Sequence, residues 1–278
     1  MTTIKAVRRT LAAALLALGA TLAQAAPASL FIEDLTWPEL RDRIAAGATV
    51  ALVPVGGTEQ NGPHMTLGKH NLRVRLLAER IAARLGNALV APVVAYVPEG
   101  AIEPPQAHMR WPGTISVPAP AFESMLEGTV RSLQHAGFTD VVLLGDHGGY
   151  RKSLERVAAR VPHTQALPEY YRASVADFAQ VLRARGFSDV EIGLHAGLAD
   201  TALMLALDPS AVRADVMRAR TPLPSQSSRG DGVEGDPRRA SAELGSAALQ
   251  HVVTVTVAAI RARTAPGAAS KPQSATRP

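Results

Sequence analysis

The sequence predicts an α/β fold with three layers, a mainly parallel sheet covered by helices on both faces. Short apolar runs rich in valine and leucine alternate with longer segments in which apolar residues recur at helical spacing. Strands that alternate with helices form parallel sheets, because each crossover helix packs back onto the sheet. No internal repeat is found, so one domain is expected, over residues 28–263.

The elements can be assigned in order along the chain. Thr36, Pro38 and Glu39 have the pattern of a helix start, and this first helix is expected to end near Gly47. Buried strands are expected where apolar runs lack helical spacing, at 50–55, 88–97 and 140–144. Further helices are expected at 73–85, 119–136, 152–160, 174–185 and 238–261, and one more is expected to end at about residue 207.

Composition limits the possible functions. The 278 residues are 47% hydrophobic and 19% charged, which is ordinary for a globular protein. The formal charge of +5 comes largely from Lys5, Arg8 and Arg9 and from the basic tail, so the body is close to neutral. Basic stripes with interleaved aromatic residues are absent from the sequence, so nucleic acid is not an expected partner.

The N-terminus has the pattern of a secretory signal peptide over residues 1–25. Basic residues precede an apolar run at 11–22, and Ala23-Gln24-Ala25 fits a cleavage site. The alternative is a membrane anchor, but the run is shorter than the roughly 20 residues that span a bilayer. We therefore expect a periplasmic or secreted protein with no stable membrane insertion after cleavage. The segment 264–278, rich in Ala, Pro and Ser, is expected to be disordered.

The loop after the first strand carries Glu59, His64 and His70, and His147 follows the third strand directly. Because ligands gather beyond the carboxyl ends of parallel strands, these side chains are expected at one edge of the sheet. Glu59, His70 and His147 are a suitable ligand set for Zn²⁺, with Mn²⁺ as the alternative. The other interpretation is that Glu59 caps a helix and the histidines are ordinary residues.

Two further segments carry candidate residues. Gly148 and Gly149 permit close approach of a ligand to the backbone, although a tight turn also explains them. His195 and Asp200 lie where a helix begins, and Asp200 is either a ligand or a helix cap. The sequence has no cysteine and no Gly-x-Ser-x-Gly motif, so a metal-activated water is the simplest available nucleophile.

Five blocks resemble the creatininase (creatinine amidohydrolase) family. The first is Pro-Val-Gly-Gly-Thr-Glu-Gln-Asn-Gly-Pro-His-Met at 54–65. The others follow in the family's order, within a resemblance that spans 36–262: His-Met-Arg-Trp-Pro-Gly-Thr at 108–114, Asp-His-Gly-Gly at 146–149, His-Ala-Gly-Leu-Ala-Asp-Thr at 195–201, and Gly-Val-Glu-Gly-Asp-Pro at 232–237.

The resemblance implies a creatininase-like α/β/α fold, a homo-oligomer (often a hexamer), and a divalent-metal centre with typically two ions. It also implies hydrolysis of a C–N amide bond in a small molecule, often in a ring. The family's metal ligands fall on Glu59, His147 and Asp200. His195 takes the position of a histidine that assists proton transfer, and His195 and Asp200 are the expected catalytic residues.

Two positions depart from the family's pattern. Asn61 replaces a ligand histidine, and His70 replaces a bridging aspartate. A carboxylate can bridge two cations, whereas a neutral imidazole offers one lone pair. We therefore expect one ion, held by Glu59, His70 and His147 with Asp200 as a further ligand, while Asn61 orients the substrate.

The expected function is that of a metal-dependent amidohydrolase. The alternative is a degenerate family member that binds a small nitrogenous ligand or a metal without turnover. The residues expected to contact the substrate are Asn61, His64, His108, Trp111, Gly148, Gly149 and Tyr150.

Overall fold

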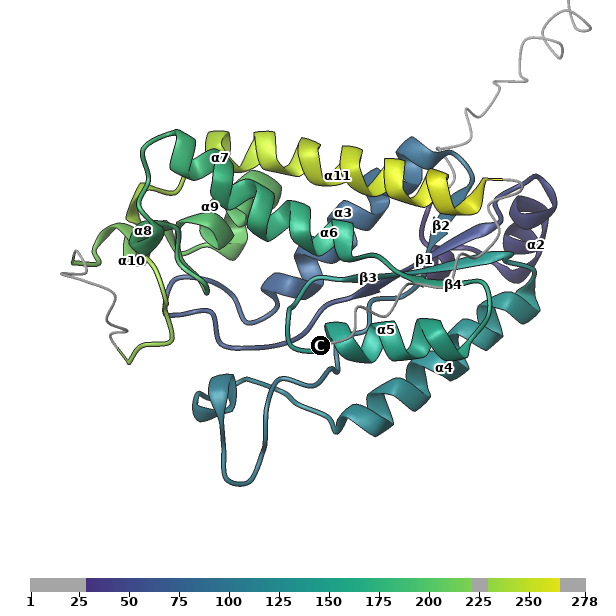
Figure 1. Ribbon diagram of the computed structural model, residues 1–278, viewed down its shortest axis with the longest axis horizontal. Helices are drawn as coiled ribbons and strands as arrows, with labels where there is room; N and C mark the ends of the chain where they lie inside the picture. Colours follow the sequence, from purple (N-terminus) through teal and green to yellow (C-terminus); the bar gives the residue numbers. More distant parts are fainter. Residues whose placement is uncertain (1–28, 222–229, 266–278) are drawn as a thin grey trace, which may run out of the picture.

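A computed structural model describes residues 29–221 and 230–265 (Figure 1). The predicted signal peptide at 1–25 and the tail from residue 266 lie outside the described residues. The strands are β1 (Val50–Val55), β2 (Ala88–Val90), β3 (Asp140–Gly145) and β4 (Thr164–Ala166). They form a parallel sheet in the order β2-β1-β3-β4. Val55 pairs with Gly145, so the loops that follow β1 and β3 leave from the same edge.

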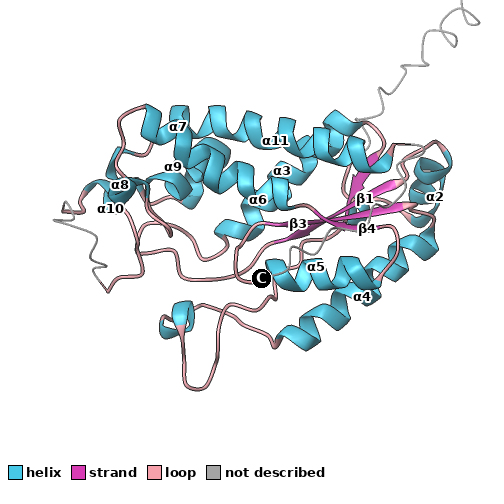
Figure 2. Ribbon diagram, in the orientation of Figure 1, coloured by secondary structure: helices cyan, strands magenta, loops and turns pink. Residues whose placement is uncertain are grey.

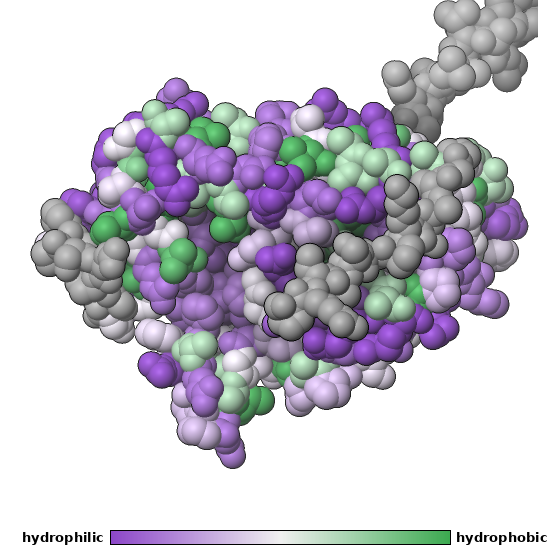
Figure 3. Space-filling model, in the orientation of Figure 1, coloured by the Kyte–Doolittle hydropathy of each residue, from purple (hydrophilic) through white to green (hydrophobic). Residues whose placement is uncertain are grey.

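Helices cover both faces of this sheet (Figure 2), which confirms the predicted three-layer architecture. The helical elements are η1 (Ile32–Asp34), α2 (Trp37–Ala45), α3 (Lys69–Leu85), η2 (Ala107–Arg110), α4 (Ala119–Ala136), α5 (Arg151–Arg160), α6 (Pro168–Arg172), the π-helical turn η3 (Ala173–Asp177), α7 (Phe178–Ala184), α8 (Asp189–Ile192), α9 (Leu198–Leu207), η4 (Pro209–Ala211), α10 (Ala214–Arg218), η5 (Pro237–Arg239) and α11 (Ala242–Thr264). The face of the molecule seen in Figure 3 is mostly hydrophilic, with apolar residues scattered over it.

The core has two main parts, one on each face of the sheet. Leu52 and Val142 point to the side of α3, α9 and α11, while Val53 and Leu143 point to the side of α4 and α5. This alternation along each strand is the period-2 pattern of a sheet that is buried on both faces.

The long helix α11 is apolar enough, by length and composition, to cross a membrane, and 44% of its most apolar window is buried in the described fold. Its buried residues pack in the same cluster as α3 and α9. Contact with α9 is closest at Gly245, where an added Cβ would lie 2.0 Å from the carbonyl oxygen of Ala202. The helix is therefore a core element of this domain.

Several predicted boundaries differ from the structure. The strand expected at 88–97 ends at Val90, because the next bond of the ladder would come from residue 54 of β1, a proline without an N–H. Helix α3 begins at Lys69, four residues before the predicted start, and α11 begins at Ala242, where Ser241 accepts a hydrogen bond from the Leu244 amide. Strand β4 was not predicted, since its three residues include no apolar run.

Candidate metal centre

The loops after β1 and β3 are fastened together behind the site by Tyr150. Its hydroxyl lies 2.7 Å and 2.6 Å from the carbonyl oxygens of Val55 and Gly56 and accepts hydrogen bonds from the amides of Asp146 and His147. Only 1% of Tyr150 is exposed. Tyr150, which was expected to contact substrate, therefore positions the loop that carries His147.

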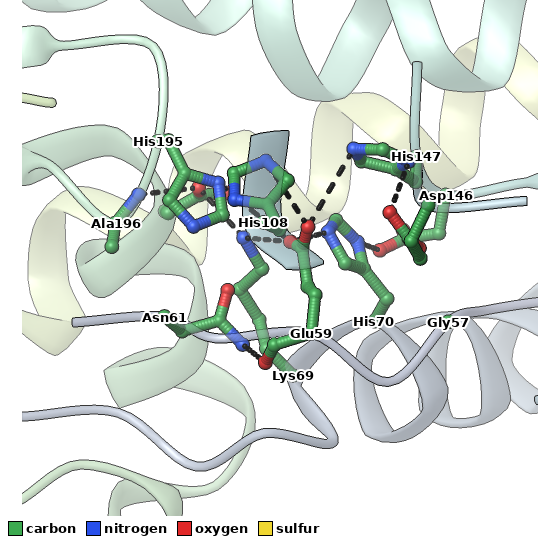
Figure 4. A network of polar contacts seen from close by, with 12 residues as sticks. Gly57, Glu59, Asn61, Lys69, His70, His108, Asp146, His147, His195 and Ala196 are labelled. Carbon is green, nitrogen blue, oxygen red and sulfur yellow. Dashed lines mark hydrogen bonds and ion pairs between the residues drawn. The ribbon is translucent and has the colours of Figure 1, made fainter. Parts of the chain in front are cut away.

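The site is built around the carboxylate of Glu59, which is fully buried. Four imidazoles from separate segments turn a ring nitrogen toward it (Figure 4). The distances to Glu59 Oε1 are 2.8 Å from His70 Nε2 and 3.6 Å from His195 Nδ1, and those to Oε2 are 3.4 Å from His108 Nε2 and 3.7 Å from His147 Nε2. Oε2 is buried without a hydrogen-bond partner. Buried carboxylate oxygens are normally paired, so this atom marks a place for a ligand.

The partner of the second ring nitrogen orients each imidazole. His70 Nδ1 lies 2.6 Å from Asp146 Oδ2, and His195 Nε2 lies 2.8 Å from the carbonyl oxygen of Gln60. The Gln60 carbonyl accepts the Nε2 proton of His195 and so leaves its Nδ1 lone pair facing Glu59. His70 lies between two carboxylates, since its Nε2 is also 2.8 Å from Glu59 Oε1. His108 differs, since its Nδ1 lies 2.9 Å from the side-chain amide nitrogen of Gln60, a donor, so its Nε2 carries the proton.

The orientation of the Gln60 amide is fixed by two backbone contacts. Its nitrogen donates to the carbonyl oxygen of Gly232, and its oxygen accepts from the amide of Gly62. A flipped amide would lose both bonds, so the proton on His108 Nε2 follows from the packing of this loop. His108 was expected from the sequence to contact substrate, and the structure brings it beside Glu59.

His147 is half-buried and lies beside a second acid, Glu99, whose Oε2 is 3.2 Å from His147 Nδ1. The amide of Gly149 lies 3.3 Å from the same nitrogen. Burial raises the pKa of Glu99 to about 9, with a further contribution from the charge of Glu59. Glu99 was not singled out from the sequence, because an acid in a loop of prolines and glycines carries no local signal of burial.

The electrostatic environment keeps Glu59 charged and two of the histidines neutral. Burial alone would raise the pKa of Glu59, but Lys69 and His70 outweigh it and hold this pKa well below the usual range. Burial lowers the pKa of His147 to about 3, and burial followed by the charge of Lys69 lowers that of His195 to about 3. A charged carboxylate among neutral imidazoles is the state in which these groups ligate a cation.

Asp200 is held by cations of the chain itself. One of its oxygens lies 3.0 Å from Lys69 Nζ and accepts from the amide of Ala196, and the other lies 2.7 Å from Arg73 Nη1. Arg73 also lies 2.8 Å from Asp146 Oδ2. The structure thus places the predicted ligand Asp200 in a buried ion-pair network, with both oxygens engaged.

The remaining predicted residues are spread around this centre. The amide nitrogen of Asn61 donates to the carbonyl oxygens of Glu59 and Thr66, while its buried Oδ1 has no partner. His64, which was expected to contact substrate, is fully buried and its Nε2 lies 3.1 Å from the Thr201 hydroxyl. Trp111 is half-buried in the loop that carries His108.

The glycines after His147 permit close packing. An added Cβ at Gly148 would lie 2.7 Å from the hydroxyl oxygen of Tyr171, and one at Gly149 would lie 3.0 Å from the His147 ring. Any side chain here would displace one of these rings.

Lys69 and Arg73 were not predicted as part of the site, although both are almost fully buried in it. Charged residues near the start of an amphipathic helix usually face solvent. No sequence signal shows that α3 begins inside the protein, so these two could only be found from the structure.

The comparisons with known proteins agree with the predicted resemblance. The family model described as Creatininase: Creatinine amidohydrolase matches residues 33–260. The chain is 30% identical over 266 residues to the creatinine amidohydrolase of Pseudomonas putida, covering 84% of this chain and 96% of that protein.

Solved creatininase structures have the same fold. A mutant creatininase described as Zn-Zn type and a structure described as Creatininase Mn each superpose with a TM-score of 0.67 at 28% identity. Each match covers 86% of this chain and 100% of the other. The chain therefore belongs to the creatininase (creatinine amidohydrolase) family.

Proposed function

We propose that this protein hydrolyses a C–N amide bond in a small molecule, within a ring or a linear chain, using one divalent ion held by Glu59, His70 and His147. The observation that carries the proposal is the buried Glu59 carboxylate, which has one oxygen unpartnered and four imidazoles around it. Two imidazoles and a carboxylate form a donor set typical of catalytic zinc, and Mn²⁺ is the alternative.

The carboxylate of Glu59 lies between the two rings. The nitrogen of His70 lies 2.8 Å from Oε1 and that of His147 lies 3.7 Å from Oε2. For comparison, two ligands on one tetrahedral zinc ion are about 3.3 Å apart when each bond is about 2.0–2.1 Å. Acids stand behind both rings, Asp146 at His70 and Glu99 at His147, as metal-ligating histidines commonly require.

By distance alone His108 is also a candidate ligand, since the donor atoms of Glu59, His108 and His147 lie within 4.8 Å of one another. The surroundings of the two rings differ. Gln60 donates to His108 Nδ1 at 2.9 Å, whereas His147 Nδ1 lies 3.2 Å from the Glu99 carboxyl, an acceptor, as well as 3.3 Å from the Gly149 amide. We therefore assign His147 as the ligand and His108 as a hydrogen-bond donor to the reacting group.

A divalent ion at this place would lower the pKa of a water molecule from ~15.7 toward ~7 and polarise the amide carbonyl. His195, neutral and with its Nδ1 lone pair facing the site, accepts the proton that the attacking water releases. The protonated His195 then gives this proton to the nitrogen that leaves as the C–N bond breaks, and His108 Nε2 donates a hydrogen bond to the reacting group. Proton transfer of this kind contributes typically about 10²–10⁴-fold to the rate.

The test combines metal analysis with a hydrolysis screen. The protein is stripped with a chelator, reloaded with Zn²⁺ or Mn²⁺, and assayed on creatinine, other cyclic amides and linear N-acyl amines. We expect hydrolysis only after reloading. An ion held tightly with no turnover on any substrate would favour the alternative, a family member that binds without catalysis, and full activity in the stripped protein would refute the proposal.

Histidine variants separate the assigned roles. His70→Ala is expected to lose the ion, whereas His108→Ala is expected to keep it and to lose about 10²–10³-fold in kcat. His135→Ala, an exposed histidine, is the matched control and is expected to change neither. If His108→Ala loses the ion and His70→Ala retains it, the ligand assignment is reversed.

We also propose that the chain is exported to the periplasm or secreted, and that it works as a homo-oligomer, a hexamer by family resemblance. The N-terminal pattern supports export, and family membership supports assembly. N-terminal sequencing of the mature protein and light scattering in solution test the two statements.

A further inference from the structure

A buried lysine lies directly beside the Glu59 carboxylate. Lys69 is the first residue of α3 and is only 1% exposed. Its Nζ lies 3.4 Å from Glu59 Oε1 and 3.0 Å from Asp200 Oδ2. A buried ammonium is stable only when paired, and these two carboxylates provide the pairing.

The two oxygens of Glu59 therefore face different surroundings (Figure 4). Oε2 faces His108 and His147 and is unpartnered, whereas Oε1 already has Lys69 Nζ and the His70 ring close to it. One side of the carboxylate is open to a cation. The other side already has one, supplied by the chain.

Arg73 reinforces this arrangement from behind. Its guanidinium lies 2.7 Å from Asp200 Oδ1 and 2.8 Å from Asp146 Oδ2, and Tyr170 donates to Asp146 Oδ1. Asp200 thus has Lys69 on one oxygen and Arg73 on the other. If either oxygen turned to a metal ion, a buried cation would lose one of its two carboxylate partners.

We propose that the Lys69 ammonium takes the place that a second divalent ion would need between Glu59 and Asp200, so that the centre holds one ion. This inference rests on the proposed function, since it concerns the same site. A relative described as Zn-Zn type gives the contrast, with 28% identity to this chain. Lys69 is a positioning residue in this assignment, because it acts on Glu59 and contacts no reacting atom.

The formal charges of these ion-paired groups also favour a centre with one ion. Glu59, Asp146 and Asp200 contribute three negative charges, and Lys69 and Arg73 contribute two positive ones, so the network has a formal charge of −1. One divalent ion brings it to +1, and a second would bring it to +3. An excess of three like charges in a buried site is strongly unfavourable.

The experiment counts ions in the wild-type protein and in three variants. Each is loaded with excess Mn²⁺ and desalted, metal per chain is measured by elemental mass spectrometry, and the Mn²⁺ is examined by electron paramagnetic resonance. We expect one ion per chain and an isolated Mn²⁺ spectrum for the wild type. Lys69→Ala is expected to bind two ions with a spin-coupled spectrum.

Two matched controls accompany it. Lys69→Arg keeps the charge and is expected to bind one ion, and Lys152→Ala removes an exposed lysine and is expected to resemble the wild type. In Lys69→Ala, propylammonium is expected to compete with the second ion and to raise its dissociation constant at least tenfold. Two ions in the wild type, or one ion of unchanged affinity in Lys69→Ala, would overturn the inference.

If Lys69→Ala is too unstable for desalting, melting temperatures measured in the presence of ligand provide the second test. Propylammonium alone is expected to raise the Tm of this variant and to leave that of the wild type unchanged, because only the variant has the vacated place. An equal effect on both would refute the role of Lys69. A wild type that binds no ion at all would instead refute the proposed function, so the two failures are distinguishable.

Discussion

Replacing Tyr150 with phenylalanine tests whether one hydroxyl holds the metal loop in place. In the wild type this group accepts from the amides of Asp146 and His147 and lies within hydrogen-bond distance of the carbonyl oxygens of Val55 and Gly56. The Asp146 amide keeps its ladder bond to Val55 in the variant, but the His147 amide has no other partner among the contacts of the described residues.

The expected cost follows from these contacts. A buried donor left unpaired costs about 1–3 kcal/mol, and the lost hydroxyl-to-carbonyl bond adds about 0.5–1.5 kcal/mol. Tyr150→Phe should therefore lower the free energy of unfolding by about 1.5–4.5 kcal/mol. For a domain of this size that corresponds to a fall in Tm of roughly 3–18 °C.

Urea denaturation and thermal melting of the stripped protein measure this effect. Tyr96→Phe, at a tyrosine that is 62% exposed, is the control and should change the unfolding free energy by less than about 0.5 kcal/mol. Since His147 is an assigned ligand, affinity for Zn²⁺ should also fall, by about 10–100-fold. If Tyr150→Phe is as stable as the control and binds zinc equally well, the hydroxyl does not hold the loop.

Three further outcomes are expected. Gly245→Ala, whose Cβ would meet the Ala202 carbonyl oxygen at 2.0 Å, should lower the free energy of unfolding in urea by about 1–3 kcal/mol. Gly128→Ala, in the exposed, open part of α4, should raise it by about 0.5–1 kcal/mol. Similar values for both variants would contradict the close packing of α9 and α11. Arg156 and Arg160 lower the pKa of Glu123 to about 2. The stability that Glu123 adds is therefore present above its unfolded pKa near 4.5 and is lost as the pH falls toward 2. The difference in unfolding free energy between the wild type and Glu123→Gln should shrink over that window, and a constant difference would exclude this linkage. Chelation should lower the Tm, and returning Zn²⁺ should restore it with a dependence on ion concentration, while a Tm that is indifferent to both would count against a resident ion.

Much of the fold and the family could be predicted from the sequence. The apolar runs of β1 and β3 and the glycine that ends α4 act locally, so their positions follow from short-range patterns. The α/β architecture, the creatininase family and the class of C–N hydrolases are confirmed by the structure and the comparisons.

The site was predictable in its centre and not in its surroundings. Glu59, His70 and His147 do converge beyond the carboxyl ends of β1 and β3, as parallel-strand geometry requires. The burial of Lys69 and Glu99 depends on long-range packing around them, which leaves no trace in neighbouring residues. The ligand roles themselves stay predictions until metal is measured.

The burial of the Lys69 side chain bears on how the protein behaves when metal is scarce. A cation that belongs to the polypeptide has no dissociation constant and is not removed by chelators or by competing ligands in the surroundings. Glu59 and Asp200 therefore keep a counter-charge between them in every folded molecule. In the proposed one-ion centre only the Oε2 side depends on supply, so recovery from starvation would require capture of a single ion at a carboxylate already aligned to receive it.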